Sequence, residues 1–394
     1  MKHITSILIL LAFALPQLCK AQEVQKYLPK IQNYTKGELE LKSTSFGENN
    51  PITIGKVTAD GTIHFNWPSL DLNDMTEHNF HTTTTKDFTK AKYCRDSTAT
   101  MINEDVILVE NKYVYLFKYG QLVGCIIPST QEGQEHREDQ LGSTLNWIFS
   151  DDETSAQANC TEKKEWEDLY SFDETTAYDL TFKKGWNMIS KTLSAVEEYE
   201  NETGTTSSLP KTKIAQSLDQ IPTDIHWHVK YWANDELLEI EQQLLAKVPI
   251  TKEDYDKWAP NSLGNLNRTN YEVGKELERM PNTNNINLLF ENGTKKIDLT
   301  IVDCVGNKNA ASMFTLMQDM ASRDWKDKKE TGYQSASTMD NIRVLTDYNK
   351  SDSKTLLTYN AQHRFSIIAE ASDIEPEELW AYLKDLDLET LVKE

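Results

Sequence analysis

The triplet His226-Trp227-His228 combines residue types and spacing that could do chemistry. In a β-strand, positions i and i+2 point to the same face, so the two imidazoles would lie side by side. Such a pair can bind zinc or copper when a third ligand is near. The commoner outcome is a hydrogen-bonded or solvated pair at the rim of an aromatic-rich strand. His226 and His228 are therefore candidate metal ligands with a structural alternative.

A second group of potential ligands lies earlier in the chain and comprises Asp71, Asp74, His78 and His81. We expect it in a loop between strands, and the same two interpretations apply to it.

The standard signatures of catalysis and cofactor binding are missing from the sequence. It contains no His-Glu-x-x-His, no Gly-x-Ser-x-Gly, no phosphate-binding glycine loop and no EF-hand loop. Cys-x-x-Cys is also absent, which argues against disulfide exchange. Carboxylate pairs suited to glycoside hydrolysis must occur among 62 acidic residues, but their abundance makes any choice uninformative. We therefore expect no cofactor, and the sequence favours a protein that is not an enzyme.

The first residues resemble an export signal. Lys2 is followed by an apolar run from Ile4 to Pro16 and by small residues before a cleavage site after Ala21. Residues 1–21 are thus expected to be a signal peptide, and the protein periplasmic or extracellular. Cys19 could instead be the lipidated cysteine of a lipoprotein, but Leu18 stands where lipidation requires a small residue. No later stretch approaches the roughly 20 apolar residues of a transmembrane helix.

The charge balance excludes one class of partner. The net charge is −21, and removal of Lys2 and Lys20 with the signal peptide makes it −23. So acidic a chain repels the phosphate backbone of nucleic acids and disfavours anionic lipid surfaces. A protein or small molecule of unknown identity remains as the partner.

Four cysteines follow the predicted signal peptide, and they allow three pairings. Cys125 and Cys304 lie in apolar, strand-like sequence and are expected to be buried thiols. Cys94 and Cys160 lie among polar residues in turn-like sequence. We predict a disulfide between Cys94 and Cys160, which an oxidising compartment preserves.

Residues 22–233 have the pattern of a β-rich domain. Short alternating or β-branched segments recur at close spacing, and turn sequences such as Ala59-Asp60-Gly61-Thr62 separate them. Two polar inserts, residues 132–142 and 197–212, are interpreted as surface loops. This pattern predicts an all-β domain, either a sandwich or a barrel.

The pattern changes at residue 234. Leucine and isoleucine then recur at helical spacing, Asn234 is a suitable N-cap and Pro249 follows, so residues 234–249 are predicted to form a connecting helix. Residues 250–394 predict an α+β domain in which helices cover one face of an antiparallel sheet. Its helix at 309–322 carries an apolar stripe of Met313, Leu316, Met317 and Met320, interpreted as core. A last helix begins at Pro376.

The segment Leu263-Gly264-Asn265-Leu266-Asn267-Arg268-Thr269 is similar to the pattern P-x-x-L-x-G-L-x-R-T/S, with Asn265 where the pattern has glycine. Through this motif, residues 250–392 resemble a family of exported bacterial proteins and lipoproteins that has no assigned function. A weaker likeness to exported β-domains covers residues 147–186. These resemblances imply an envelope location and a domain boundary. The sequence as a whole therefore predicts an exported protein that binds a partner or small ligand through its β-rich domain, and the alternative is an extracytoplasmic hydrolase with a metal site at His226 and His228.

Overall fold

The computed structural model describes residues 28–43, 51–78, 80–90, 94, 98–111, 113–132, 137, 139–166, 170–200, 204, 206–278 and 281–392. The predicted signal peptide and Cys19 lie outside the described residues. The described chain is mostly β-strand. It divides into two compact units, called unit 1 (residues 1–233) and unit 2 (residues 234–394).

The described residues of unit 1 form one hydrogen-bonded sheet of fourteen strands. Its pairings are antiparallel except for the parallel pair β11–β13. The strands are β1 (Leu39–Ser43), β2 (Ile52–Val57), β3 (Ile63–Phe65), β4 (Thr82–Thr84), β5 (Thr98–Ile102), β6 (Ile107–Asn111), β7 (Val114–Lys118), β8 (Gln121–Ser129), β9 (Gly142–Ser150), β10 (Thr154–Trp166), β11 (Tyr170–Phe182), β12 (Gly185–Glu200), β13 (Thr206–Leu218) and β14 (His226–Tyr231). The described helices of this unit are α2 (Leu72–Glu77) and α3 (Thr85–Phe88).

The turn predicted at residues 59–62 lies between β2 and β3. Gly61 has a φ of +86°, a conformation that glycine adopts without the steric penalty of a Cβ. Asp60 fixes the turn by accepting hydrogen bonds from the side chains of Thr58 and Thr62, and these bonds hold the pKa of its carboxyl well below the usual range.

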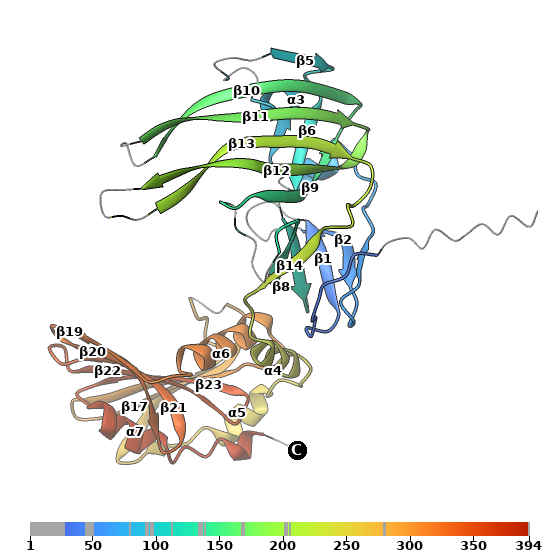
Figure 1. Ribbon diagram of the computed structural model, residues 1–394. Coiled ribbons are helices and arrows are strands. Elements are labelled where there is room, and N and C mark those ends of the chain that lie inside the picture. Colours follow the sequence, from blue (N-terminus) through green and yellow to red (C-terminus); the bar gives the residue numbers. More distant parts are fainter. Residues whose placement is uncertain are drawn as a thin grey trace, which may run out of the picture. The chain divides into compact units, whose positions relative to one another are not determined.

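Four long, curved strands, β10 to β13, lie side by side in unit 1 (Figure 1). The prediction of a surface loop at residues 197–212 is wrong, because β12 continues to Glu200 and β13 begins at Thr206. The interpretation of Cys160 as part of a turn is wrong as well, since it lies within β10. These strands are rich in Thr, Ser, Glu and Lys. Where they lack an alternating apolar pattern, pairing with the neighbouring strands stabilises them instead.

The core beside these strands is small. Leu108, Ile148, Leu180, Phe182 and Ile189 are buried together with Ala215. Phe88 of α3 packs edge-on against Phe182 at a centroid distance of 6.4 Å, so α3 lies over the same face of the sheet.

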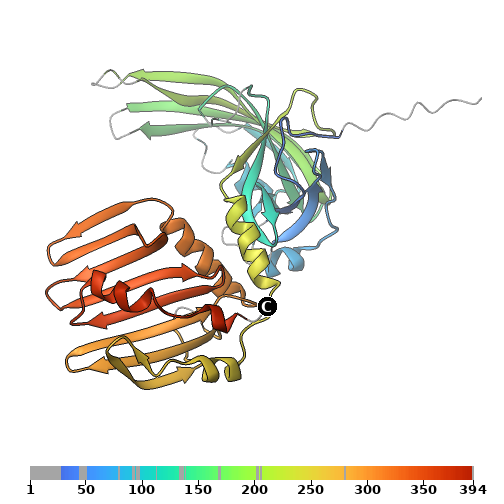
Figure 2. The same ribbon diagram turned by 90° about the horizontal axis from the view of Figure 1, so that it is seen from below.

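Unit 2 contains a sheet of nine antiparallel strands in the order β15-β16-β17-β18-β23-β22-β21-β20-β19. The strands are β15 (Ser262–Leu263), β16 (Leu266–Val273), β17 (Asn284–Asn292), β18 (Lys295–Asp303), β19 (Trp325–Lys329), β20 (Gly332–Met339), β21 (Ile342–Asn349), β22 (Lys354–Ala361) and β23 (Phe365–Ser372). The helices are α4 (Asp235–Leu245), α5 (Lys252–Trp258), α6 (Lys308–Met320), α7 (Pro376–Leu383) and the 3-10 helix η1 (Glu389–Leu391). Figure 2 shows α7, in red, lying across this sheet. The side chain of Asn234 caps α4 by accepting a hydrogen bond from the backbone N–H of Glu236.

Helices cover both faces of this sheet, so the prediction of helices on one face is wrong. Phe365 and Ile367 of β23 belong to a core with Leu379 of α7, while Ile368 packs with Phe314 of α6 on the other side. Successive residues of a strand point to opposite faces, and β23 is apolar on both. The apolar stripe predicted on α6 is only partly buried. Met317 belongs to the core, whereas Leu316 is 52% exposed.

A buried ion pair joins the strands of unit 2. The carboxylate of Asp303 at the end of β18 accepts hydrogen bonds from Arg364 at 2.8 and 2.9 Å and from the backbone N–H of Ile250 at 2.8 Å. Arg364 also donates to the carbonyl oxygen of Val248 at 2.7 Å. The pair therefore fastens the segment that follows α4 to the sheet.

Candidate functional site

A cavity of about 1180 Å³ lies within unit 1. Residues of β11, β12 and β13 contribute to its lining, together with residues of α3, β4, β6, β8 and β9 and of the loops between these elements. Its volume lies a little above the usual range of small-molecule sites, whose volumes run from a few hundred to roughly 1,000 Å³. The apolar and aromatic lining residues are Phe88, Tyr113, Ile127, Pro128, Leu145, Tyr178, Leu193, Leu209, Pro210, Ile214 and Ala215.

Strand pairing brings the lining residues to one face. Lys191 of β12 lies opposite Ala215 of β13, and Ala215 lies opposite Tyr178 of β11. Two residues along each strand, and so on the same face, Leu193, Lys213 and Thr176 form a second row of opposed residues. Directly opposed residues share a face, so the rows place a lysine from each of two neighbouring strands on the cavity side.

Each of these lysines has an acidic partner on another strand. Lys191 forms an ion pair with Glu110 of β6. Lys213 pairs with Glu174 of β11 at 2.6 Å, and the Glu174 side chain is only 11% exposed. The two pairs make a band of alternating charge across the face of the sheet, beside the apolar side chains.

The band extends to β10. Glu162 lies opposite Glu174 in the strand pairing and forms ion pairs with Lys164 and, at 4.0 Å, with Lys90. The hydrogen bond from Lys164 is the main reason that the pKa of Glu162 lies below its usual range. Burial, together with the charge of Glu162, raises the pKa of Tyr178 to about 12, so its hydroxyl stays protonated at neutral pH.

A hydrogen-bonded turn at the cavity wall is built around Gln131. Its side-chain amide donates to the carbonyl oxygens of Arg137 at 2.8 Å and Gln140 at 3.0 Å, and its side-chain oxygen accepts from the backbone N–H of Arg137 at 2.8 Å. The backbone carbonyl of Gln131 lies 3.1 Å from Nε2 of His228. His228 therefore supports this wall from β14.

The two candidate metal ligands lie in β14 as predicted, with ring centroids 6.4 Å apart. His228 is buried and His226 is partly buried. The described part of the chain contains no group of three or more His, Cys, Asp or Glu residues placed to hold a metal ion. The metal site at His226 and His228 stays a prediction without a third ligand of these types in that part.

The second group of predicted ligands is divided between two places. Asp71 and Asp74 exchange hydrogen bonds between their carboxylates and backbone N–H groups at 2.8 and 3.0 Å, around the start of α2. The prediction of a loop is wrong for Asp74, which lies within α2, whereas His78 lies in the turn after that helix. His81 lines the cavity.

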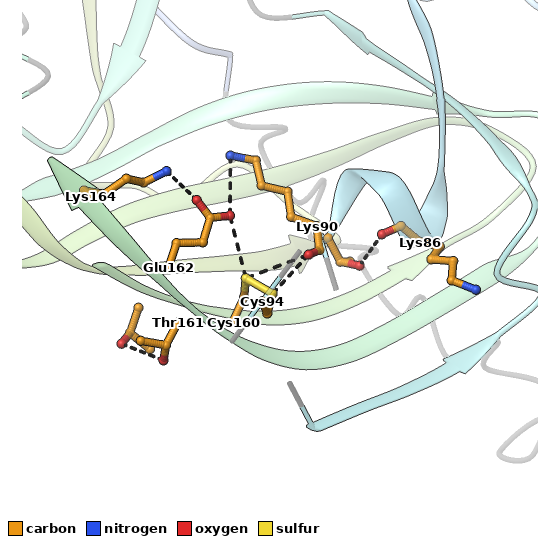
Figure 3. The surroundings of a disulfide bond; sticks show 9 residues. Lys86, Lys90, Cys94, Cys160, Thr161, Glu162 and Lys164 are labelled. Atoms are coloured by element: carbon orange, nitrogen blue, oxygen red, sulfur yellow. Dashed lines mark hydrogen bonds and ion pairs between the residues drawn. A yellow bond between two sulfur atoms is a disulfide. The ribbon is translucent and has the colours of Figure 1, made fainter. Parts of the chain in front are cut away.

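The predicted disulfide Cys94–Cys160 is present, with the two Cα atoms 5.0 Å apart (Figure 3). It ties the chain that follows α3 to β10. Lys90, which lines the cavity, forms its ion pair with Glu162 beside the bond. The wall formed by α3 is thus fastened by one covalent and one ionic contact.

The other two cysteines are buried free thiols, as predicted. Burial raises the pKa of Cys304 to about 12 and also raises that of Cys125. A buried protonated thiol is a poor nucleophile, so neither residue has the environment of a reactive cysteine.

Sequence analysis missed Glu110, Glu174, Lys191 and Lys213, which form the two ion pairs between strands that line the cavity. A signal existed in β12, where Ile189, Lys191 and Leu193 alternate so that a lysine shares the inward face with two apolar residues. An inward lysine between buried neighbours implies a partner or a solvent-filled space. The partner itself, Glu110, is 81 residues away, and no local pattern connects the two.

Comparison with protein-family models, with curated proteins and with solved structures gives no match. The resemblance of residues 250–392 to exported proteins therefore stays a prediction. Across the described residues, no helix has both the length and the apolar character needed to cross a membrane.

Proposed function

We propose that unit 1 binds a small amphipathic organic molecule in its cavity and does not transform it. The observation that carries the proposal is the combination, in one cavity of about 1180 Å³, of a large apolar lining with a band of paired charges. Concave, mostly apolar spaces with a few placed polar groups are the usual form of a ligand site. In this proposal the curved sheet acts as a barrel-like cradle for the ligand.

The charges of the cavity favour binding over catalysis. A general acid needs a carboxyl pKa raised towards neutrality. Lys164 instead lowers the pKa of Glu162, and Glu110 and Glu174 are held in ion pairs with lysines. The alternative of a metal-dependent hydrolase lacks a third ligand beside His226 and His228 in the described residues.

The proposal places the protein in the cell envelope. The features that support export are the signal-like residues 1–21 and the Cys94–Cys160 disulfide, since such bonds persist in oxidising compartments. An envelope protein of this kind would carry or sense its ligand outside the cytoplasm.

Native mass spectrometry of the protein purified from its own cells tests the binding function. We expect an added mass of a few hundred daltons that is lost on denaturation. Thr176→Trp places an indole within the cavity and should abolish the added mass, whereas Thr181→Trp, at an exposed position of the same strand facing the other way, should retain it. Equal retention by both variants would place the ligand elsewhere.

A further inference from the structure

The cavity of unit 1 has a charge balance unlike that of the protein. Among the lining residues that the structure describes, four are basic (Lys90, Arg137, Lys191 and Lys213) and four are acidic (Asp87, Glu110, Asp139 and Glu174), which sums to zero. The whole chain carries −21. A lining without net charge, in a protein that is otherwise strongly acidic, favours a ligand that also has no net charge.

Each basic residue of the lining has an acidic partner in the structure. Lys191 pairs with Glu110, Lys213 with Glu174 at 2.6 Å, Arg137 with Asp139 at 2.9 Å and Lys90 with Glu162 at 4.0 Å. The described part of the lining therefore presents no basic side chain without an acidic partner. An anion that captured Lys213 would leave Glu174, whose side chain is 11% exposed, without its ion-pair partner.

Leaving a charge unpaired in a partly buried position is unfavourable, because the low local dielectric penalises it more than water does. The same reasoning applies with opposite sign to a cation that captured Glu174. A ligand without net charge avoids both penalties. The polar groups of an uncharged ligand accept and donate hydrogen bonds beside intact ion pairs. The positive and negative groups of a zwitterionic ligand form ion pairs with Glu174 and Lys213, so that neither side chain is left without a counter-charge.

We propose that the ligand of this cavity is a net-neutral amphiphile, either uncharged or zwitterionic, and that the Lys213–Glu174 pair sets this selectivity. The inference rests on the proposed function, since it concerns the ligand of the same cavity. The apolar lining takes the hydrocarbon part of the ligand, and the charged band across β11, β12 and β13 meets its polar part.

A matched set of four probes tests the proposal by isothermal titration calorimetry below the concentrations at which they form micelles. Each carries one ten-carbon chain, and the head groups are maltoside, dimethylglycine, carboxylate and trimethylammonium. We expect the uncharged maltoside or the zwitterionic dimethylglycine probe to bind at least about tenfold more tightly than decanoate and decyltrimethylammonium, as a difference of about 1.4 kcal/mol implies. Which of the two binds better separates an uncharged ligand from a zwitterionic one.

Variants of the ion pair extend the test. Lys213→Met should shift the preference to decyltrimethylammonium, Glu174→Gln should shift it to decanoate, and the double variant should restore the net-neutral preference. Lys183→Met serves as the control, because the pair of Lys183 with Asp219 is highly exposed and neither residue lines the cavity.

The possible failures are distinguishable. Tightest binding of decanoate or decyltrimethylammonium to the unaltered protein would overturn the charge selectivity and leave the binding function standing. Unchanged preferences in folded single variants would overturn the role of Lys213 and Glu174. Binding of none of the four probes would instead count against the proposed function itself. If the single variants fail to fold, the ranking on the unaltered protein still decides the selectivity.

Discussion

Replacing both Cys94 and Cys160 with alanine should destabilise unit 1 by about 4 kcal/mol. The two cysteines are 66 residues apart in sequence. In the chain-entropy description, a cross-link that closes a loop of this length removes roughly 15 cal/mol/K from the unfolded chain, which is about 4 kcal/mol at 25 °C. Cys160 is also buried, so the loss of its sulfur adds a small packing cost in the same direction.

Urea unfolding followed by tryptophan fluorescence measures the effect. Six of the nine tryptophans precede residue 234, so the signal reports mainly on unit 1. For a slope of about 2 kcal/mol/M, the transition of unit 1 should move to lower urea by about 2 M. Cys94→Ala alone should move it nearly as far, because either substitution opens the loop. Reductant should shift the unaltered protein in the same way and leave the double variant unchanged.

A shift below about 0.5 kcal/mol, with unfolding cooperative in both proteins, would refute the reasoning. It would mean that the cross-link does not constrain the unfolded chain, or that it does not form in solution. Counting the free thiols of the denatured, unreduced protein separates these cases, because Cys94 and Cys160 react with a thiol reagent only when the bond has not formed.

Three further results are expected. Arg364→Met should cost about 3–5 kcal/mol in the unfolding of unit 2, since it leaves Asp303 buried without its counter-charge; a loss under 1 kcal/mol by thermal or urea unfolding would contradict this. Cys125 and Cys304 should resist iodoacetamide at pH 8 in the native protein and react after unfolding, as mass spectrometry would show, because burial raises both pKa values. The pKa of Glu162 is lowered in the folded state, so its contribution to stability is present above its unfolded value of 4.5 and is lost as pH falls through the lowered folded value. Between pH 5 and 3 the unaltered protein should therefore lose more stability than Glu162→Gln, and parallel pH profiles would be the contrary result.

Local features of unit 2 were readable from the sequence. Asn234 caps α4, Pro376 begins α7, and Leu379 and Leu383 are buried on one side of that helix. Caps, proline positions and apolar periodicity act within a few residues, and they therefore leave a local signature. The buried face of α6 was predicted less well. The small residues Ala310 and Ala311 are buried there, whereas the larger Leu316 is exposed.

The Cys94–Cys160 bond and the strand content of unit 1 were also predicted, but the extent of β10 and the ends of β12 and β13 were not. Polar strands carry a weak pattern, and only pairing with their neighbours makes them strands. In β12 and β13, twelve residue pairs from Met188–Leu218 to Glu200–Thr206 hold segments that look like loops in the sequence.

Features readable along the chain were its acidic character, the β-rich and α+β portions, the starts of α4, α6 and α7 and the two buried thiols. The cavity was decided by tertiary structure alone. Its Lys213–Glu174 and Lys191–Glu110 pairs join residues 39 and 81 positions apart, and they meet because β6, β11, β12 and β13 bring them to one face. Charge and periodicity are properties of neighbouring residues, whereas a cavity is a property of which distant strands pair and in which register.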